Sequence, residues 1–258
     1  MAAEFNARAI ASPMANSAVA NGVSGATDFV AALESRVSRA VEKRRASYRS
    51  PRLQRGYMMQ FQEIERAVSD ELRHCTNGDL SQQRVLDIGC GAGGWLREFV
   101  KWGAKPRNLT GIDALRERVE EARELCPTGI QLICGSAENL EFEDESFDII
   151  MLFESMSLIL EEDVRRRVAA EALRVLKRSG SILWYEFRYQ RPEMKGLLAP
   201  VTKGQLKELF PGCNLMLKSI HPFPPISRRL AEIWRPAWYL FNVIPPLRTC
   251  YVGTITKR

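Results

Sequence analysis

The sequence contains little histidine and no paired cysteine motif. Its two histidines and six cysteines show none of the CxxC or CxxxH spacings that hold structural zinc, so no metal site is predicted. No stretch approaches the roughly 18 uninterrupted apolar residues of a membrane-spanning helix, because the most apolar one, residues 147–160, is interrupted by Asp148 and Glu154. Residues 1–27 lack the basic start and apolar core of a secretory signal peptide. These absences favour a cytoplasmic enzyme, and we expect the polar leader to be disordered.

The composition is that of an ordinary globular protein. The 258 residues are 45% apolar and 26% charged, which excludes a wholly disordered chain, a collagen-like chain and a coiled coil. This length suits one large α/β domain with appendages, or one domain with a small second one.

Positive charge is concentrated near the start of the chain. Residues 36–55 hold eight arginines and lysines against the single acid Glu42, whereas the whole chain has a net charge of +6. Such a segment suits nucleic acid or an anionic membrane surface. A solvated helix face is the simpler interpretation, because only Tyr48 interleaves the charges and single-strand binding uses several aromatic platforms. We therefore do not expect nucleic acid as a partner, and we expect any membrane contact to be weak.

From residue 84 onward, short apolar segments alternate with amphipathic helical segments. This alternation predicts parallel βαβ units and a doubly wound α/β sheet. Strands are expected at residues 84–88, 108–113, 130–134, 147–153, 181–187, 215–220 and 251–256. Helices are expected at residues 94–102, 116–125, 161–176 and 202–210.

Two amphipathic helical patterns, at residues 29–46 and 54–74, precede the first expected strand. No strand signal occurs before residue 84, so these helices need not complete the sheet. We interpret residues 28–76 as a helical cap at the open edge of the sheet and residues 77–258 as the enzyme domain. Removal of the cap is then expected to harm turnover more than folding.

The segment 223–247, which begins and ends near proline pairs, contains Trp234, Trp238, Tyr239 and Phe241. Because it is inserted before the last expected strand, we interpret it as a cap over the acceptor pocket. Two alternatives stay open. The segment is a helix packed on the flank of the sheet, or an interfacial helix that touches lipid, since arginines flank its aromatic residues.

The strand at residues 84–88 runs directly into the sequence GCGAGG, which starts at residue 89. Glycines after a strand allow a sharp turn and a close approach to a ligand, and the next helix presents free N–H groups to it. Gly89, Gly91 and Gly94 also fit the dinucleotide-binding pattern GxGxxG. Asp87 favours a different ligand, because dinucleotide-binding strands normally carry an apolar residue there and an acid suits a cation.

Together with this loop, residues 84–181 resemble the class I S-adenosylmethionine-dependent methyltransferases, specifically the small-molecule branch related to quinone biosynthesis. Four further segments carry the resemblance: GID at 111–113, GSAENL at 135–140, SFD at 146–148 and LRVLKRSG at 173–180. Arg178 and Ser179 replace the proline and first glycine that are usual in the last segment. The resemblance implies a Rossmann-like seven-stranded sheet with an antiparallel last strand, and S-adenosylmethionine as cofactor.

The resemblance also implies roles for the residues at the strand ends. Asp87, Gly89, Gly91 and Gly93 would hold the methionine half of the cofactor. Asp113 would bind both ribose hydroxyls, a role that suits a carboxylate because it accepts two hydrogen bonds from a vicinal diol. A helix N-cap is the alternative for Asp113. The remaining cofactor contacts are expected from Ala114, Ser136, Ala137, Glu138 and Phe153, and from Arg55 and Tyr57 at the joint between the two N-terminal helices.

An alcohol or phenol acceptor must be positioned and must lose a proton. The candidates for this catalytic work are Glu154, Tyr189 and His221, with Glu186 and Arg188 at the same expected edge of the sheet. Histidine titrates in the useful pH range, but His221-Pro222 equally suits a turn that caps the sixth strand.

We therefore expect an enzyme that transfers a methyl group from S-adenosylmethionine to a small molecule, more readily to oxygen than to nitrogen or carbon. The acceptor is expected to be a biosynthetic metabolite or a sugar- or lipid-linked compound. The fourth strand lacks the Asn/Asp-Pro-Pro-Tyr motif of exocyclic-amine methylation and the Pro-Cys nucleophile of cytosine-5 methylation. Two alternatives remain: a nicotinamide-dependent oxidoreductase, and a non-catalytic cofactor-binding or RNA-associated module.

Overall fold

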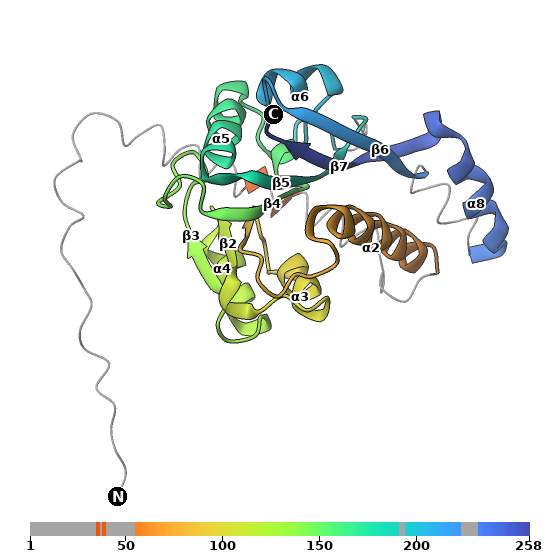
Figure 1. Cartoon of the computed structure of the whole chain (residues 1–258). Helices are drawn as coiled ribbons and strands as arrows, with labels where there is room; N and C mark the ends of the chain where they lie inside the picture. Colours follow the sequence, from red (N-terminus) through yellow and green to blue (C-terminus); the bar gives the residue numbers. More distant parts are fainter. Residues whose placement is uncertain (1–34, 37, 40–54, 191–193, 223–231) are drawn as a thin grey trace, which may run out of the picture.

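The computed structural model describes residues 35–36, 38–39, 55–190, 194–222 and 232–258 (Figure 1). Its centre is one seven-stranded sheet with the strand order β3-β2-β1-β4-β5-β7-β6. The strands are β1 (Val85–Ile88), β2 (Leu109–Asp113), β3 (Gln131–Cys134), β4 (Phe147–Phe153), β5 (Leu176–Phe187), β6 (Asn214–Pro222) and β7 (Arg248–Thr256). β7 is antiparallel to both of its neighbours, β5 and β6, whereas the pairs from β3 to β5 are parallel. The expected Rossmann-like sheet with an antiparallel last strand is confirmed.

The order of the strands determines where a ligand can bind. From β1 the chain moves outward to β2 and β3, then returns to place β4 on the other side of β1. The connections that leave β1 and β4 therefore diverge, and open α/β sheets bind ligands outside the carboxyl ends of the strands at such a switch point.

Helices cover both faces of the sheet. α2, α3 and α4 lie on one side, and α5 and α6 lie on the other (Figure 1). The helices are α2 (Arg55–Thr76), α3 (Gly94–Lys101), α4 (Arg116–Leu125), α5 (Glu162–Val175), α6 (Lys203–Leu209) and α8 (Arg235–Val243), with short 3₁₀ turns η2 (Pro106–Asn108), η3 (Met156–Leu158) and η5 (Pro245–Leu247).

The two faces of the sheet produce two apolar cores. Successive side chains of a strand point to opposite faces, so in β4 Ile149 and Met151 join the core under α2 and α3, while Ile150 and Leu152 join the core under α5. All four side chains are at most 1% exposed. This explains why β4 reads as a continuous apolar run rather than as an alternating one.

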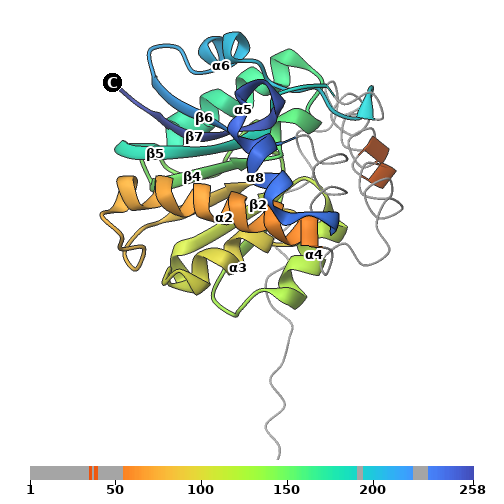
Figure 2. The ribbon, with the colours of Figure 1, turned by 90° about the vertical axis from the view of Figure 1, so that its right-hand side faces the viewer.

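The expectation that the N-terminal helices stay outside the core is wrong for α2. Its residues Ile64, Val68 and Leu72 are buried in the same core cluster as Leu183 of β5 and Val252 of β7. α2 lies across the face of the sheet formed by β5, β7 and β6 rather than at its open edge (Figures 1 and 2). Without α2 this face would expose apolar side chains to water, which is why the helix belongs to the fold.

Of the first expected helix, only residues 35–36 and 38–39 are described, and all four are helical. The Arg36 guanidinium pairs with the Glu161 carboxylate at 3.1 Å, just before α5. This segment therefore reaches the edge of the sheet where the chain leaves β4. The expected leader at residues 1–27 lies outside the described residues.

The segment expected to cap the pocket is described from residue 232. α8 contacts the first half of α2, where Trp238 packs on Met59 and the Asn242 side-chain amide donates to Oε1 of Glu63. Residues 223–231 are not among those described, so the cap over the pocket stays a prediction. In the described part of the chain, no helix is both long and apolar enough to cross a bilayer.

The position of α2 generates a stability prediction. Leu72→Ala should lower the free energy of unfolding by about 2–5 kcal/mol, because it leaves a cavity in the core. Gln62→Ala, at an exposed position of the same helix, should change it by less than about 0.5 kcal/mol. Urea denaturation measures both variants. Equal stabilities of the two variants would show that α2 is a dispensable cap.

Candidate active site

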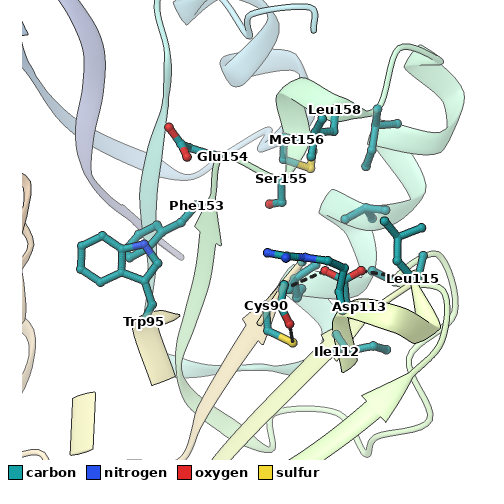
Figure 3. A pocket seen from close by; sticks show the side chains of 18 of the residues that line it. Cys90, Trp95, Ile112, Asp113, Leu115, Phe153, Glu154, Ser155, Met156 and Leu158 are labelled. Atoms are coloured by element: carbon teal, nitrogen blue, oxygen red, sulfur yellow. Dashed lines mark hydrogen bonds between the residues drawn. The ribbon is translucent and has the colours of Figure 1, made fainter. Parts of the chain in front are cut away.

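A cavity of about 540 Å³ opens at the carboxyl ends of β1, β2 and β4 (Figure 3). It is therefore at the switch point that the strand order defines. The sequence predicted nine of the residues that line it: Gly89, Gly91, Asp113, Ala114, Ser136, Ala137, Glu138, Phe153 and Glu154. These residues come from four separate strand ends, which the fold brings together around one space.

The glycine loop after β1 forms the floor of this cavity. The backbone N–H groups of Gly89 and Cys90 both donate to the carbonyl of Ile112, at 2.8 and 3.1 Å. Gly89 has a φ of +80°, and a Cβ atom there would lie 2.6 Å from the Cβ atom of Ser155. Only glycine combines this backbone conformation with so close an approach of β1 to the end of β4.

Asp113 holds the loop from the neighbouring strand. Its Oδ2 accepts the N–H of Gly91 and its Oδ1 accepts the N–H of Leu115, both at 2.9 Å. The second bond closes a turn just before α4, whose N-cap is Leu115 and has no side-chain cap, so Asp113 is not the helix N-cap that was the alternative. Each carboxylate oxygen can accept more than one hydrogen bond, which leaves capacity for a diol. Burial raises the pKa of Asp113, and the two N–H donors partly offset this.

Asp87 lies behind the loop and is only 2% exposed. Burial, reinforced by the nearby carboxylate of Asp113, raises its pKa to about 8. No ion pair among the described residues involves Asp87. Two acidic groups buried beside a cavity favour a ligand that brings positive charge, because such a ligand stabilises their ionised forms.

The first turn of α3 adds a second binding feature. Gly93 precedes this helix in a left-handed conformation, and no side chain caps the N–H groups of the first turn. Free N–H groups at a helix N-terminus attract carboxylates and other anions. The loop therefore offers positive partial charge on one side and buried carboxylates on the other, which fits a zwitterionic amino-acid group.

The turn after β3 lines the opposite end of the cavity. The Ser136 hydroxyl accepts the N–H of Glu138 at 3.2 Å, and the Glu138 carboxylate pairs with Arg167 of α5 at 2.7 Å. These contacts hold the turn open beside Ala137.

Aromatic and aliphatic side chains form the remaining wall. Trp95 of α3 packs edge-on against Phe153 with ring centroids 5.0 Å apart (Figure 3). Phe187, Met194 and Leu198 line the same cavity. The sequence analysis missed Trp95, Met194 and Leu198. Only the position of Trp95, one residue inside the helix that follows the loop, was a usable signal.

Six predicted site residues do not line the cavity: Asp87, Gly93, Arg55, Tyr57, Tyr189 and His221. The first two belong to the strand and loop that form its floor. The other four lie elsewhere, so the expectation that they reach the ligand is not met by their positions.

Among these four, His221 is wholly buried between two hydroxyl groups. Its Nε2 is 3.1 Å from the Tyr185 hydroxyl and its Nδ1 is 3.1 Å from the Thr249 hydroxyl. The Tyr189 hydroxyl donates to the carbonyl of Pro246, and the Arg55 guanidinium donates to the carbonyl of Glu232. The places of these residues in the sequence did not predict where their side chains point.

Residues 85–180 match a family model described as a methyltransferase domain. This segment begins with β1 and contains every strand end that lines the predicted cofactor site. This segment is a methyltransferase domain, and its sheet has the class I fold. The cofactor of the domain is S-adenosylmethionine, and the nicotinamide alternative is not supported.

Two curated proteins resemble the methyltransferase domain. The phthiotriol/phenolphthiotriol dimycocerosates methyltransferase 1 of Mycobacterium ulcerans is 35% identical over 118 residues, which are 45% of this chain and 42% of that protein. The fatty-acid O-methyltransferase of Mycolicibacterium smegmatis is 30% identical over 145 residues, or 54% and 52% of the two chains. The chain thus spans about half the length of the curated relatives it matches.

Solved structures show the same fold at lower identity. The PH0226 protein of Pyrococcus horikoshii superposes with a TM-score of 0.54 and 17% identity, over 77% of this chain and 91% of that one. This likeness extends well beyond residues 85–180, so the structural similarity includes elements that the family model does not match.

The contacts of Asp113 generate a binding prediction. Asp113→Ala should weaken the binding of S-adenosylhomocysteine by about 1–3 kcal/mol, the scale of lost hydrogen bonds to a charged group. Glu117→Ala, at an exposed position in the first turn of α4, serves as the matched control. Calorimetric titration compares the two. Equal affinities would restrict Asp113 to its structural contacts with Gly91 and Leu115.

The buried carboxyl of Asp87 generates a pH prediction. Its pKa is raised from 3.8 to about 8 in the folded protein, so the fold favours the protonated group and this contribution to stability is lost as the pH rises toward 8. In the free protein, Asp87→Asn should therefore flatten the decline of the melting temperature over that range. The variant should also bind the cofactor more weakly. Parallel melting curves for wild type and variant would contradict the prediction.

Proposed function

We propose that the protein transfers a methyl group from S-adenosylmethionine to an oxygen atom of a small, apolar, lipid-like molecule. One observation carries this proposal. Beside the polar strand ends that suit the cofactor, the same cavity continues along Trp95, Phe153, Phe187, Met194 and Leu198. Such a wall provides no fixed charge for a polar acceptor but favours the burial of an apolar one. The lipid-related names of the two curated relatives point in the same direction.

The cofactor supplies a methyl group that is already activated by the attached sulfonium. The chain must therefore bind and orient the cofactor and the acceptor, and it must exclude water. In our proposal the loop of Gly89 and Gly91 and the carboxylates of Asp87 and Asp113 orient the methionine and ribose portions. The paired rings of Trp95 and Phe153 exclude water from the space where the acceptor oxygen approaches.

Glu154 is the proposed acceptor of the hydroxyl proton. It follows β4 directly, lines the cavity and has a φ of +52°. Its backbone N–H donates to the carbonyl of Tyr185 at 2.8 Å, which fixes the turn. In Figure 3 its carboxylate lies near Phe153 and away from Asp113. A base at this position would lie on the apolar side of the cavity, where we propose that the acceptor binds, rather than on the side that suits the ribose.

Glu186 has a different proposed role. Its side chain is fully buried, and its Oε1 accepts the N–H of Ser157 at 3.0 Å. Burial raises its pKa to about 7. Because Ser157 lies in η3, between the cavity residues Met156 and Leu158, Glu186 positions this wall and does not itself reach the acceptor.

Incubation with methyl-labelled S-adenosylmethionine and a panel of fatty acids, long-chain alcohols and polar alcohols tests the function. The expected result is label in the products extracted into organic solvent. Transfer only to polar acceptors, or to nitrogen, would contradict the proposed acceptor class.

Glu154→Gln tests the proposed base. With a long-chain alcohol as the acceptor, the variant should lower kcat by about 10²–10⁴-fold, because general bases contribute on that scale, and it should leave the affinity for S-adenosylhomocysteine unchanged. Glu141→Gln, at an exposed position outside the cavity, is the control. A Glu154→Gln enzyme with the wild-type kcat would show that the acceptor loses its proton to another group or to water.

A further inference from the structure

We propose that α8 and the start of α2 form a surface that binds an anionic lipid bilayer without crossing it. We call this surface the α8 face and define it by seven exposed apolar residues: Met58, Phe61, Ile233, Trp234, Tyr239, Leu240 and Val243. The inference goes beyond the proposed methyl transfer, because it concerns where the protein docks.

The first argument is the orientation of α8. Trp238, 2% exposed, faces inward onto Met59, and the Asn242 amide faces inward to Glu63. Leu240 and Val243 lie on the other side of the helix and point outward. They are 59% and 71% exposed. A surface helix normally turns its polar side to water. Here the outward side is apolar, which marks a surface that contacts another phase or molecule.

The second argument is the continuity of the α8 face with the cavity. Figure 2 shows α8 beside the start of α2, and the Gly56 N–H bond to the Glu232 carboxylate at 2.9 Å joins the two segments. Phe61 of α2 stacks on Trp95 with ring centroids 6.2 Å apart. Because Trp95 lines the cavity, the partly exposed Phe61 connects the start of α2 with the wall of the active site.

The third argument is charge. Between residues 223 and 248 the sequence contains four arginines and one acid, Glu232. Of the described residues nearby, Arg55 is exposed and Arg188 donates to the carbonyl of Pro245, next to the end of α8. A segment whose sequence combines several arginines with exposed tryptophan, tyrosine and aliphatic residues has the composition of interfacial helices on anionic membranes. A second copy of the chain would bring the same positive charge and would be repelled, so the observations favour lipid.

Flotation with lipid vesicles tests the proposal, using the full-length protein with no acceptor present. Vesicles of phosphatidylcholine with phosphatidylglycerol should bind the wild type, vesicles of phosphatidylcholine alone should bind it weakly, and high salt should release it. The double variant Leu240→Gln, Val243→Gln should bind at least about tenfold less, because it removes two apolar side chains from the interface. Met216→Gln, an equally exposed apolar position on β6, should bind like the wild type.

Two further measurements separate the possible failures. Both variants should bind S-adenosylhomocysteine like the wild type, which shows that the fold and the cofactor site are intact, and Trp234→Ser should reproduce the loss of vesicle binding. Wild-type protein that does not float, or a double variant that floats like the wild type, overturns the proposal. So does a dimer in sedimentation equilibrium that the double variant dissociates without a change in flotation. None of these results depends on whether methyl transfer occurs, so the two proposals fail separately.

Discussion

The site depends on the hydrogen bonds by which β2 holds the loop that leaves β1. The Ile112 carbonyl accepts the N–H groups of Gly89 and Cys90, and the Asp113 carboxylate accepts those of Gly91 and Leu115. Two adjacent residues thus fix the glycine turn that follows β1 and the turn that precedes α4. The cavity floor is therefore formed by the folded sheet before any ligand arrives, which reduces the entropy that binding must remove.

The same arrangement explains the unusual electrostatics of the site. Burial raises the pKa values of Asp87, Asp113 and Glu186. Above its raised pKa such a buried carboxyl group is ionised, and this buried charge destabilises the free protein. The ionised form becomes favourable when a cation is bound beside it. For Asp87 and Asp113 we propose that a cationic cofactor provides that compensation. Glu186 instead lies near Arg165, which is 3% exposed and donates to the carbonyls of Ile159 and Ala199.

Most of the sheet and its ligand-binding edge could be predicted from the sequence, because both depend on local patterns. The apolar run of β4 and the glycines after β1 determine their own conformation, and parallel strands bring their carboxyl ends to one edge. The position of α2 could not be predicted in this way. Its apolar stripe of Ile64, Val68 and Leu72 shows that one face is buried, but not which surface buries it.

The positions of individual side chains could not be predicted from local sequence patterns either. His221 is chemically suitable as a base, yet it belongs to the end of β6 and lies between the hydroxyls of Tyr185 and Thr249, because β6 and β7 pair in the register that aligns Ile220 with Cys250. Met194 and Leu198 are the opposite case, because they line the cavity but were not predicted to do so. They occur in a stretch without periodicity, and only the folded chain shows that they line the cavity.

The dual position of α2 has a consequence for the shape of an acceptor that can enter. Its buried side supports the core through Val68 and Leu72, while Phe61 on its other side stacks on Trp95 at the cavity wall. A helix that supports the core cannot rotate away as a unit without unfolding part of the sheet. The wall on this side therefore gives way only by rotation of individual rings. For the acceptor that we propose, we expect such a wall to select by cross-section rather than by length, so that a slender, flexible chain fits and a broad, rigid molecule does not.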